Sequence, residues 1–117
     1  MTVIPFAVVV RLPSLVAPSF VKDAIASNPV VVFSKTYCPF CTKAKSALNS
    51  IGAKYKTLEL DEMDNGSAVQ NALAEVTGRR TVPNVFVAGS SIGGGDETAM
   101  LKQSGKLLKM VTEAGAI

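Results

Sequence analysis

The chain has no histidine, no tryptophan and only two cysteines, and these absences restrict the chemistry it can carry. Without histidine there is no imidazole base to activate a serine or cysteine nucleophile. A closed structural zinc site takes about four Cys or His ligands, more than one chain supplies here. A small secreted domain held by disulfides normally carries roughly four or more cysteines. The cysteine pair is left with redox chemistry, a metal site shared between chains, or no function.

Long apolar runs and a strong excess of one charge are also absent. No segment approaches the roughly 18 consecutive apolar residues of a membrane-spanning helix. The net charge of +3 is mild, and there is no basic stripe or row of aromatic residues. We therefore expect neither a membrane nor a nucleic acid as partner. A chain of 117 residues, 48% of them apolar, is sufficient for one compact domain with its own core.

Residues 1–18 differ in composition from the remainder of the chain. They hold one charged residue, Arg11, which follows the apolar run Phe6–Val10, whereas the charge of a secretory signal precedes its apolar run. We interpret residues 1–18 as an N-terminal extension: a targeting segment, an extra strand or a disordered tail. Residues 19–117 are the expected folded domain. The protein is expected in the cytoplasm unless residues 1–18 direct it to an organelle.

Helical and strand patterns alternate from residue 19 onward. Ser19 is a candidate N-cap for a short helix over 20–27. The continuous apolar run at 30–34 is typical of a buried strand. Further helices are expected over 39–50 and 65–76, from Asp96 and after Gly105, and further strands over 54–60, 84–87 and around Ile92.

The order of these elements predicts the fold class. The strand–helix–strand unit over 30–60 implies a parallel pair with a right-handed crossover. The turn at Gly89-Ser90-Ser91 implies an antiparallel hairpin. The expected fold is α/β, with a mixed four-stranded sheet flanked by helices.

Cys38 and Cys41 lie where the buried strand passes into a helix. Pro39 fits the first helical turn, where its missing N–H has no cost. Cys38 is therefore at or near the helix N-cap, where backbone N–H groups and the helix dipole favour a thiolate, the reactive form. Three lysines nearby in sequence would act in the same direction: Lys35, Lys43 and Lys45.

Cys41 has a different position from Cys38. It begins an apolar stripe that continues through Ala44, Leu48 and Ile51, so it faces the interior. We expect Cys38 to attack a disulfide and Cys41 to resolve the resulting mixed disulfide. The alternative is two inert cysteines, one capping the helix and one in the core. The Cys-x-x-Cys spacing at a strand-to-helix turn favours redox function.

Two later segments have the character of ligand-binding loops. Pro83 precedes a strand and cannot donate to its ladder. A cis bond would make it a fixed turn that leaves the Val82 backbone free for a ligand, whereas a trans bond makes it an ordinary strand-entry proline. Over 93–97, three glycines precede a helix start, which indicates either an anion site or a flexible loop with Asp96 as N-cap.

Three motifs together resemble the dithiol glutaredoxin family. They are Lys35-Thr36-Tyr37-Cys38-Pro39-Phe40-Cys41, Thr81-Val82-Pro83 and Gly93-Gly94. The resemblance covers about residues 19–115 and extends to Glu59-Leu60-Asp61. It implies a thioredoxin-like fold, with a central four-stranded mixed sheet flanked by helices.

The resemblance also implies an activity. The protein would be a glutathione-dependent thiol–disulfide oxidoreductase that reduces protein disulfides and glutathione mixed disulfides. Cys38 would be the nucleophile and Cys41 the resolving thiol. Glutathione would be a co-substrate, with no tightly bound cofactor and no metal. The other partners would be glutathionylated or disulfide-containing proteins, and the protein would be a monomer.

The same resemblance implies a set of glutathione-binding residues. Lys35 and Gln70 would meet the glycine carboxylate, and Asp96 and Glu97 would lie near the γ-glutamyl end. The full implied set is Lys35, Tyr37, Gln70, Thr81, Val82, Pro83, Gly94, Asp96 and Glu97. Four residues depart from the family pattern: Phe40 in place of Tyr, Arg79 in place of Gln, Gly95 in place of Cys, Asn or Ala, and Glu97 in place of Asp.

Two other functions compete with this interpretation. A thioredoxin-like protein reductant would use a dedicated reductase, but the chain lacks the Trp-Cys-Gly-Pro-Cys pattern of that relative. A dimer could share an iron–sulfur cluster through thiolates of two chains and two glutathiones. Cluster-binding glutaredoxins tend to have Gly where this chain has Pro39, which stiffens the turn.

We expect the protein to hold no iron–sulfur cluster, because Pro39 restricts the turn that presents Cys38. Anaerobic purification should therefore yield a colourless protein without iron, as measured by visible absorption and iron analysis. A brown protein that carries iron would contradict this expectation.

Overall fold

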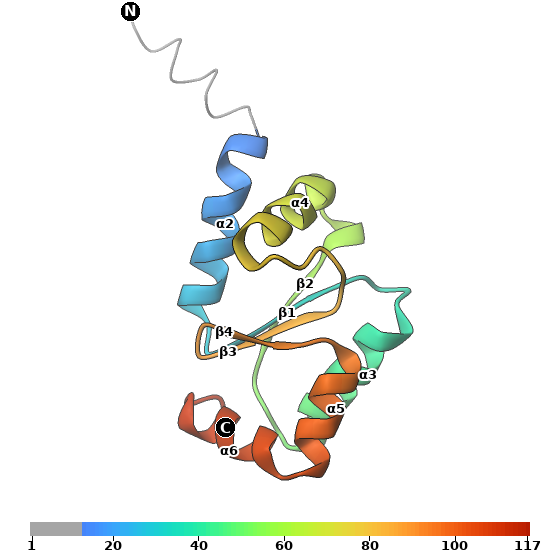
Figure 1. The fold of residues 1–117 in the computed structure, drawn as a ribbon, viewed down its shortest axis with the longest axis vertical. Coiled ribbons are helices and arrows are strands. Elements are labelled where there is room, and N and C mark those ends of the chain that lie inside the picture. The colour runs from blue at the N-terminus through green and yellow to red at the C-terminus, as the bar shows by residue number, and fades with distance from the viewer. Residues whose placement is uncertain (1–12) are drawn as a thin grey trace, which may run out of the picture.

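A computed structural model describes residues 13–117, and its centre is a four-stranded sheet in the order β2-β1-β3-β4 (Figure 1). The strands are β1 (Val30–Ser34), β2 (Lys56–Glu59), β3 (Asn84–Val87) and β4 (Ser90–Gly93). β1 pairs in parallel with β2 and antiparallel with β3, and β3 and β4 form an antiparallel hairpin. The mixed sheet expected from the sequence is confirmed.

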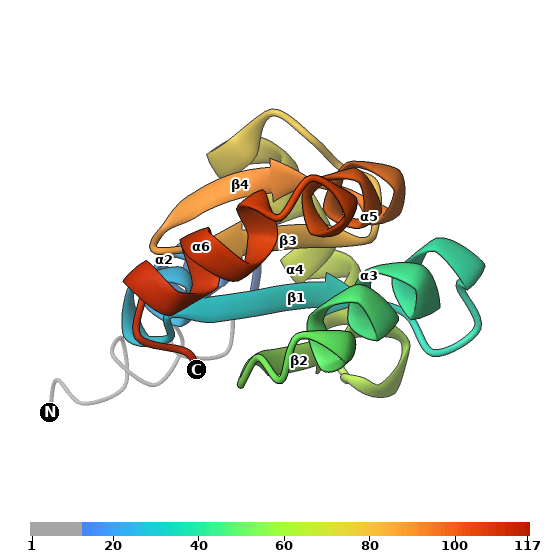
Figure 2. The ribbon, with the colours of Figure 1, turned by 90° about the horizontal axis from the view of Figure 1, so that it is seen from below.

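Helices cover both faces of the sheet (Figures 1 and 2). One face carries α2 (Pro13–Ser27) and α4 (Gly66–Thr77), and the other carries α3 (Pro39–Ser50), α5 (Gly95–Gln103) and α6 (Lys106–Glu113). A short 3-10 helix, η1 (Leu60–Glu62), follows β2. Among residues 13–117, none of the helices has the length and apolar character needed to span a membrane.

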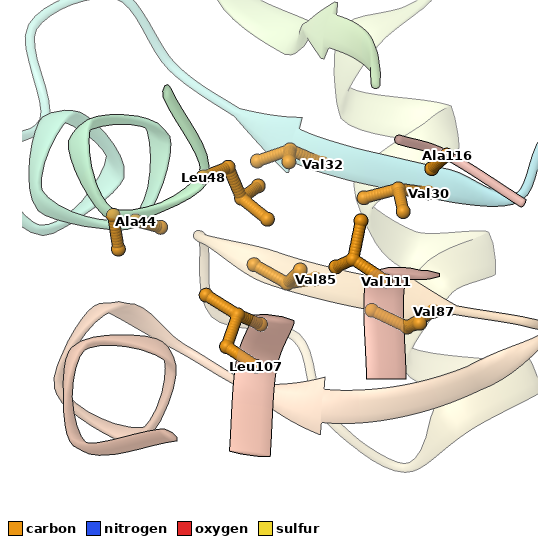
Figure 3. Close-up of a cluster of buried hydrophobic side chains, with 10 residues drawn as sticks. Val30, Val32, Ala44, Leu48, Val85, Val87, Leu107, Val111 and Ala116 are labelled. Carbon is orange, nitrogen blue, oxygen red and sulfur yellow. The ribbon is translucent and has the colours of Figure 1, made fainter. Parts of the chain in front are cut away.

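The central position of β1, covered by helices on both faces, explains why its sequence is apolar. Val30 and Val32 face α3 and α6 and pack with Leu48 (Figure 3), whereas Val31 and Phe33 face α2 and α4. Because side chains alternate along a strand, a strand covered on both faces is apolar throughout. The two cores hold β1 in place, and β1 carries the chain to the first cysteine.

The first helix begins earlier than the sequence pattern indicates. We expected Ser19 to cap a helix over 20–27, but α2 begins at Pro13, so Ser19 lies inside it and the expectation was wrong. Pro18 removes only one N–H, and packing beside α4 with Val21 fully buried outweighs that loss. The helix also crosses the expected boundary between residues 18 and 19. The remainder of the expected extension, residues 1–12, lies outside the described residues.

Several other element boundaries differ from those expected, among them α4, which is shifted by one residue from 65–76. β2 is shorter than 54–60 and passes directly into η1. The hairpin turn is formed by Ala88-Gly89, so Ser90 and Ser91 belong to β4. α5 begins at Gly95 with Gly94 as its N-cap, one residue before Asp96. These boundaries depend on backbone pairing between elements, which a local pattern does not contain.

Gly66 is required where α4 passes over η1. A Cβ added at this position would overlap the carbonyl oxygen of Leu60. We expect Gly66→Ala to lower the free energy of unfolding by about 1–3 kcal/mol, the usual effect of overpacking. Urea unfolding measures the change, with Ser67→Ala, an exposed substitution in the same turn, as control. Equal stability of the two variants would show that the contact is absent.

Candidate active site

Cys38 caps the helix that follows β1. Its backbone is extended (φ −91°, ψ 118°), Pro39 occupies the first turn of α3, and the Cys38 Sγ accepts a hydrogen bond from the Cys41 N–H at 3.3 Å. The Cys38 side chain is half-buried. The predicted N-cap position is confirmed, and the sulfur lies where the N–H groups of the first turn can stabilise negative charge.

Cys41 is fully buried on the inner face of α3, together with Ala44 and Leu48. Its sulfur accepts a hydrogen bond from the Lys35 N–H at 3.5 Å. Burial raises the pKa of the Cys41 thiol, as does the Cys38 side chain, while hydrogen bonds from Ser34 and Lys35 act in the opposite direction. The two free thiols therefore occupy unequal environments, as their positions in the sequence indicate.

The loop between β1 and α3 is tied to η1 by a carboxylate. Asp61 Oδ1 accepts the Thr36 N–H at 3.0 Å, and Asp61 Oδ2 accepts the Thr36 hydroxyl. The hydroxyl hydrogen bond is the main cause that lowers the pKa of Asp61. Sequence reasoning included Asp61 only as part of a family motif and did not identify this contact, which joins positions 25 residues apart.

Two of the three lysines expected to act on Cys38 are paired elsewhere. Lys43 Nζ lies 2.6 Å from Asp96 Oδ1, and Lys45 Nζ lies 2.7 Å from Glu59 Oε2. Lys43 and Lys45 are therefore each engaged by a carboxylate of another element, and their support of the Cys38 thiolate stays a prediction. Lys35 is in none of the ion pairs of the described residues.

The segment before β3 reaches the active-site sulfur. The Val82–Pro83 peptide bond is cis, as the family resemblance implies. The Val82 carbonyl oxygen lies 4.0 Å from Cys38 Sγ. Next to them is a pocket of ≈ 220 Å³, lined by Phe40, Arg79, Val82, Pro83, Gly94, Gly95, Asp96 and Glu97. A larger hollow of ≈ 430 Å³ is lined by residues 25–29 and the Ala88-Gly89 turn, away from Cys38.

Five of the implied glutathione-binding residues meet in this pocket, and four lie outside its lining. Gln70 donates its side-chain amide to the Arg80 carbonyl at 3.0 Å, and Thr81 Oγ1 accepts from Arg79 Nε at 3.2 Å. Tyr37 is 70% exposed, which leaves its ring available to a ligand. Lys35 and Tyr37 belong to the loop that presents Cys38.

The carboxylate of Glu97 is turned toward its own helix start. Glu97 Oε1 accepts the Gly94 N–H at 2.7 Å, which lowers the pKa of Glu97. Arg79 Nη2 lies 3.9 Å from the same oxygen. Arg79, which stands where the family has Gln, therefore lies close to the Glu97 carboxylate at the rim of the pocket.

Gly95 explains how α5 approaches the active site. A Cβ at Gly95 would lie 2.5 Å from the Phe40 carbonyl oxygen, so glycine permits this separation of α5 from α3. The glycine that stands here in place of the family's Cys, Asn or Ala therefore allows α5 to lie close to the Phe40 backbone. Within residues 13–117, no group of three or more His, Cys, Asp or Glu side chains is placed to hold a metal ion.

Comparison with known proteins gives a consistent result. Residues 30–92 match the family model described as Glutaredoxin. The chain is 56% identical over 96 residues to a glutaredoxin of Vernicia fordii (82% of this chain, 92% of the relative) and 55% identical to glutaredoxin-C2 of Arabidopsis thaliana (82% and 86%). It resembles the crystal structure of a buckwheat glutaredoxin–glutathione complex with a TM-score of 0.84 and 47% identity, covering 89% of this chain and 94% of that one.

The contact between Thr36 and Asp61 predicts a pH dependence. Because the pKa of Asp61 lies below its ordinary value of 3.8, the contact stabilises the fold above that value and is lost as pH falls through the folded pKa. Thr36→Ala should move the pKa of Asp61 back toward 3.8, as measured by carboxyl NMR titration. Thr112→Ala, an exposed substitution in α6, should leave it unchanged. An unshifted Asp61 in Thr36→Ala would contradict the assignment.

Proposed function

The chain belongs to the glutaredoxin family and is a glutaredoxin oxidoreductase with a thioredoxin-like fold, and on this premise we propose that it reduces protein disulfides and glutathione mixed disulfides with glutathione as co-substrate. The observation that carries the proposal is the half-buried Cys38 sulfur at the tip of α3. It lies 4.0 Å from the Val82 carbonyl oxygen and next to the pocket. A disulfide bound in the pocket would meet the nucleophile directly.

The reaction begins at Cys38. Its thiolate attacks the glutathione sulfur of a mixed disulfide, a new sulfur–sulfur bond forms, and the electron pair of the old bond leaves with the substrate thiolate. The Cys38–glutathione disulfide is then reduced by a second glutathione. For a protein disulfide, Cys38 forms a mixed disulfide with one protein sulfur, and Cys41 then attacks the Cys38 sulfur and releases the reduced protein. Two glutathiones reduce the resulting Cys38–Cys41 disulfide and leave as glutathione disulfide. The burial of Cys41 next to Cys38 supports this division of roles.

We place glutathione across the pocket and the Cys38 loop. The Val82 backbone, with Thr81 and Pro83, would pair with the tripeptide, and the tripeptide would contact Tyr37. Lys35 and Gln70 would receive the glycine carboxylate. For Gln70 this requires that its amide exchange the Arg80 carbonyl for the ligand.

The γ-glutamyl end would lie at the start of α5. There the N–H groups after Gly94 suit its carboxylate, and Asp96 suits its ammonium. Glu97 would act from the rim, since its carboxylate already accepts the Gly94 N–H and lies near Arg79. The buckwheat glutaredoxin that this fold resembles was solved as a complex with glutathione, which supports glutathione as the ligand.

A dithiol site reduced by glutathione requires a reducing compartment, and we propose the cytoplasm. No tightly bound cofactor is needed for thiol–disulfide exchange, and the chemistry is complete in a monomer. Glutathionylated and disulfide-containing proteins are the proposed protein partners.

The test is an assay with a small glutathione mixed disulfide, glutathione, glutathione reductase and NADPH. Cys38→Ser should reduce turnover to the uncatalysed background, because the attacking sulfur is lost. Cys41→Ser should retain deglutathionylation, because the second glutathione can resolve the adduct, and should lose reduction of protein disulfides. NADPH consumption measures the first activity, and the same assay with a protein disulfide as substrate measures the second.

Two controls separate this proposal from its competitors. Ser46→Ala, at an exposed position of α3, should behave as the wild type. Efficient turnover with thioredoxin reductase and poor use of glutathione would favour a thioredoxin-like reductant. Activity that survives in Cys38→Ser would overturn the assignment of the nucleophile.

A further inference from the structure

The space between the sheet and α3 holds polar side chains that the proposed chemistry leaves unused. Ser34 of β1 and Glu59 of β2 are partners in the parallel register, so their side chains leave the same face of the sheet. That face is covered by α3, because Val32, two residues before Ser34, packs against Leu48 (Figure 3). Ser34 is fully buried, and Glu59 faces α3 beside it.

The helix α3 presents two side chains to this face. Cys41 and Lys45 are four residues apart, the spacing at which helical side chains are neighbours. Lys45 Nζ lies 2.7 Å from Glu59 Oε2, and the two side chains are only 23% and 19% exposed. The neighbouring pair of Lys43 and Asp96 is 49% and 60% exposed, so solvent screens it far more.

The electrostatic environment links this inner ion pair to the resolving thiol. The pKa of Lys45 is raised first by its hydrogen bond to Glu59 and also by negative charge on Cys41, while burial acts in the opposite direction. The four-residue spacing on one face of α3 makes the two side chains neighbours. Glu59 Oε1 is buried without a hydrogen-bond partner among the described residues, so the carboxylate is held by Lys45. The ionisable and hydrogen-bonding groups around Cys41 and Lys45 are Cys38 on α3, Ser34 and Lys35 at the end of β1, Glu59 on β2, and Tyr55.

We propose that Lys45 is a positioning residue for the resolving step: Glu59 holds its ammonium beside Cys41, where it stabilises the thiolate that must form before Cys41 can attack. This inference rests on the proposed function. In the step, a bond forms between the Cys41 and Cys38 sulfurs, and the bond between Cys38 and the glutathione sulfur breaks. The electron pair leaves with the glutathione sulfur, and the proton from Cys41 passes through solvent to the released thiolate.

The need for such a cation follows from the burial of Cys41. A buried thiol resists ionisation, because the charged form loses its solvation. Cys38 lies at the positive end of α3, whereas Cys41 lies within the first turn and under the protein surface. A lysine one turn further along the same face supplies the missing counter-charge, and Glu59 keeps it from extending into solvent.

The test follows the glutathionyl adduct on Cys38 directly. Reduced protein is mixed with glutathione disulfide, quenched with acid at intervals, and the adduct and the Cys38–Cys41 disulfide are counted by mass spectrometry. Lys45→Gln removes the charge and keeps a donor for Glu59. Resolution of the adduct at pH 7 should be about three- to fourfold slower, with its pH profile displaced upward by about one unit, because the thiolate fraction falls more than the nucleophilicity of the thiolate rises.

Further variants make the result specific. Lys45→Arg should restore most of the rate and the pH profile, and Lys109→Gln, an exposed substitution in α6, should change neither. In the Cys41→Ser background, Lys45→Gln should leave deglutathionylation unchanged, because no resolving step remains. The double variant Lys45→Gln/Glu59→Gln, which leaves no unpaired buried carboxylate, should also resolve slowly. It provides the measurement if the single variant does not fold.

The outcomes distinguish this inference from the proposed function. A Lys45→Gln variant that resolves at the wild-type rate overturns the inference, as does a Lys45→Arg variant as slow as Lys45→Gln. If the wild type forms neither the adduct on Cys38 nor the Cys38–Cys41 disulfide, the proposed function itself is wrong.

Discussion

The structure of the site depends on one hydrogen bond, from the Cys41 N–H to the Cys38 sulfur at 3.3 Å. A helix needs an acceptor for the N–H groups of its first turn, and here the thiol that caps α3 is also the proposed nucleophile. The burial of β1 holds this turn from one side, and the Asp61 contact with Thr36 holds it from the other. The Val82 segment can therefore lie against a sulfur whose position is already determined.

Four carboxylates around the site each have a bonding partner. Each is engaged by a nearby group: Asp61 by Thr36, Glu97 by the Gly94 N–H, Asp96 by Lys43, and Glu59 by Lys45. Asp96 and Glu59 are thereby paired with lysines, whereas Asp61 and Glu97 accept hydrogen bonds from backbone and hydroxyl donors. The exposed pairs contribute little to stability, whereas the half-buried pair of Lys45 and Glu59 has the stronger field.

Sequence patterns identified most of the elements and both cysteine positions, and the errors have physical causes. The continuous apolar run of β1 and the stripe from Cys41 to Leu48 are local signals, and both are confirmed. The start of α2 was wrong because a polar residue before an apolar stretch, Ser19, imitates an N-cap, whereas packing on α4 extends the helix through Pro18. The carboxylate partners of Lys43 and Lys45 were not predicted, because closeness in sequence does not specify the partner.

The sequence by itself determined the order of strands and helices, the cap at Cys38 and the inward position of Cys41, since each depends on residues within a turn or two of one another. The tertiary structure alone decided that Val82 lies beside Cys38, that Asp61 holds Thr36, and that Glu59 pairs with Lys45. Those contacts join segments 14 to 44 residues apart. They exist because β1 lies between β2 and β3, and the carboxyl end of β1 brings the loop, α3 and both neighbouring strands to one place.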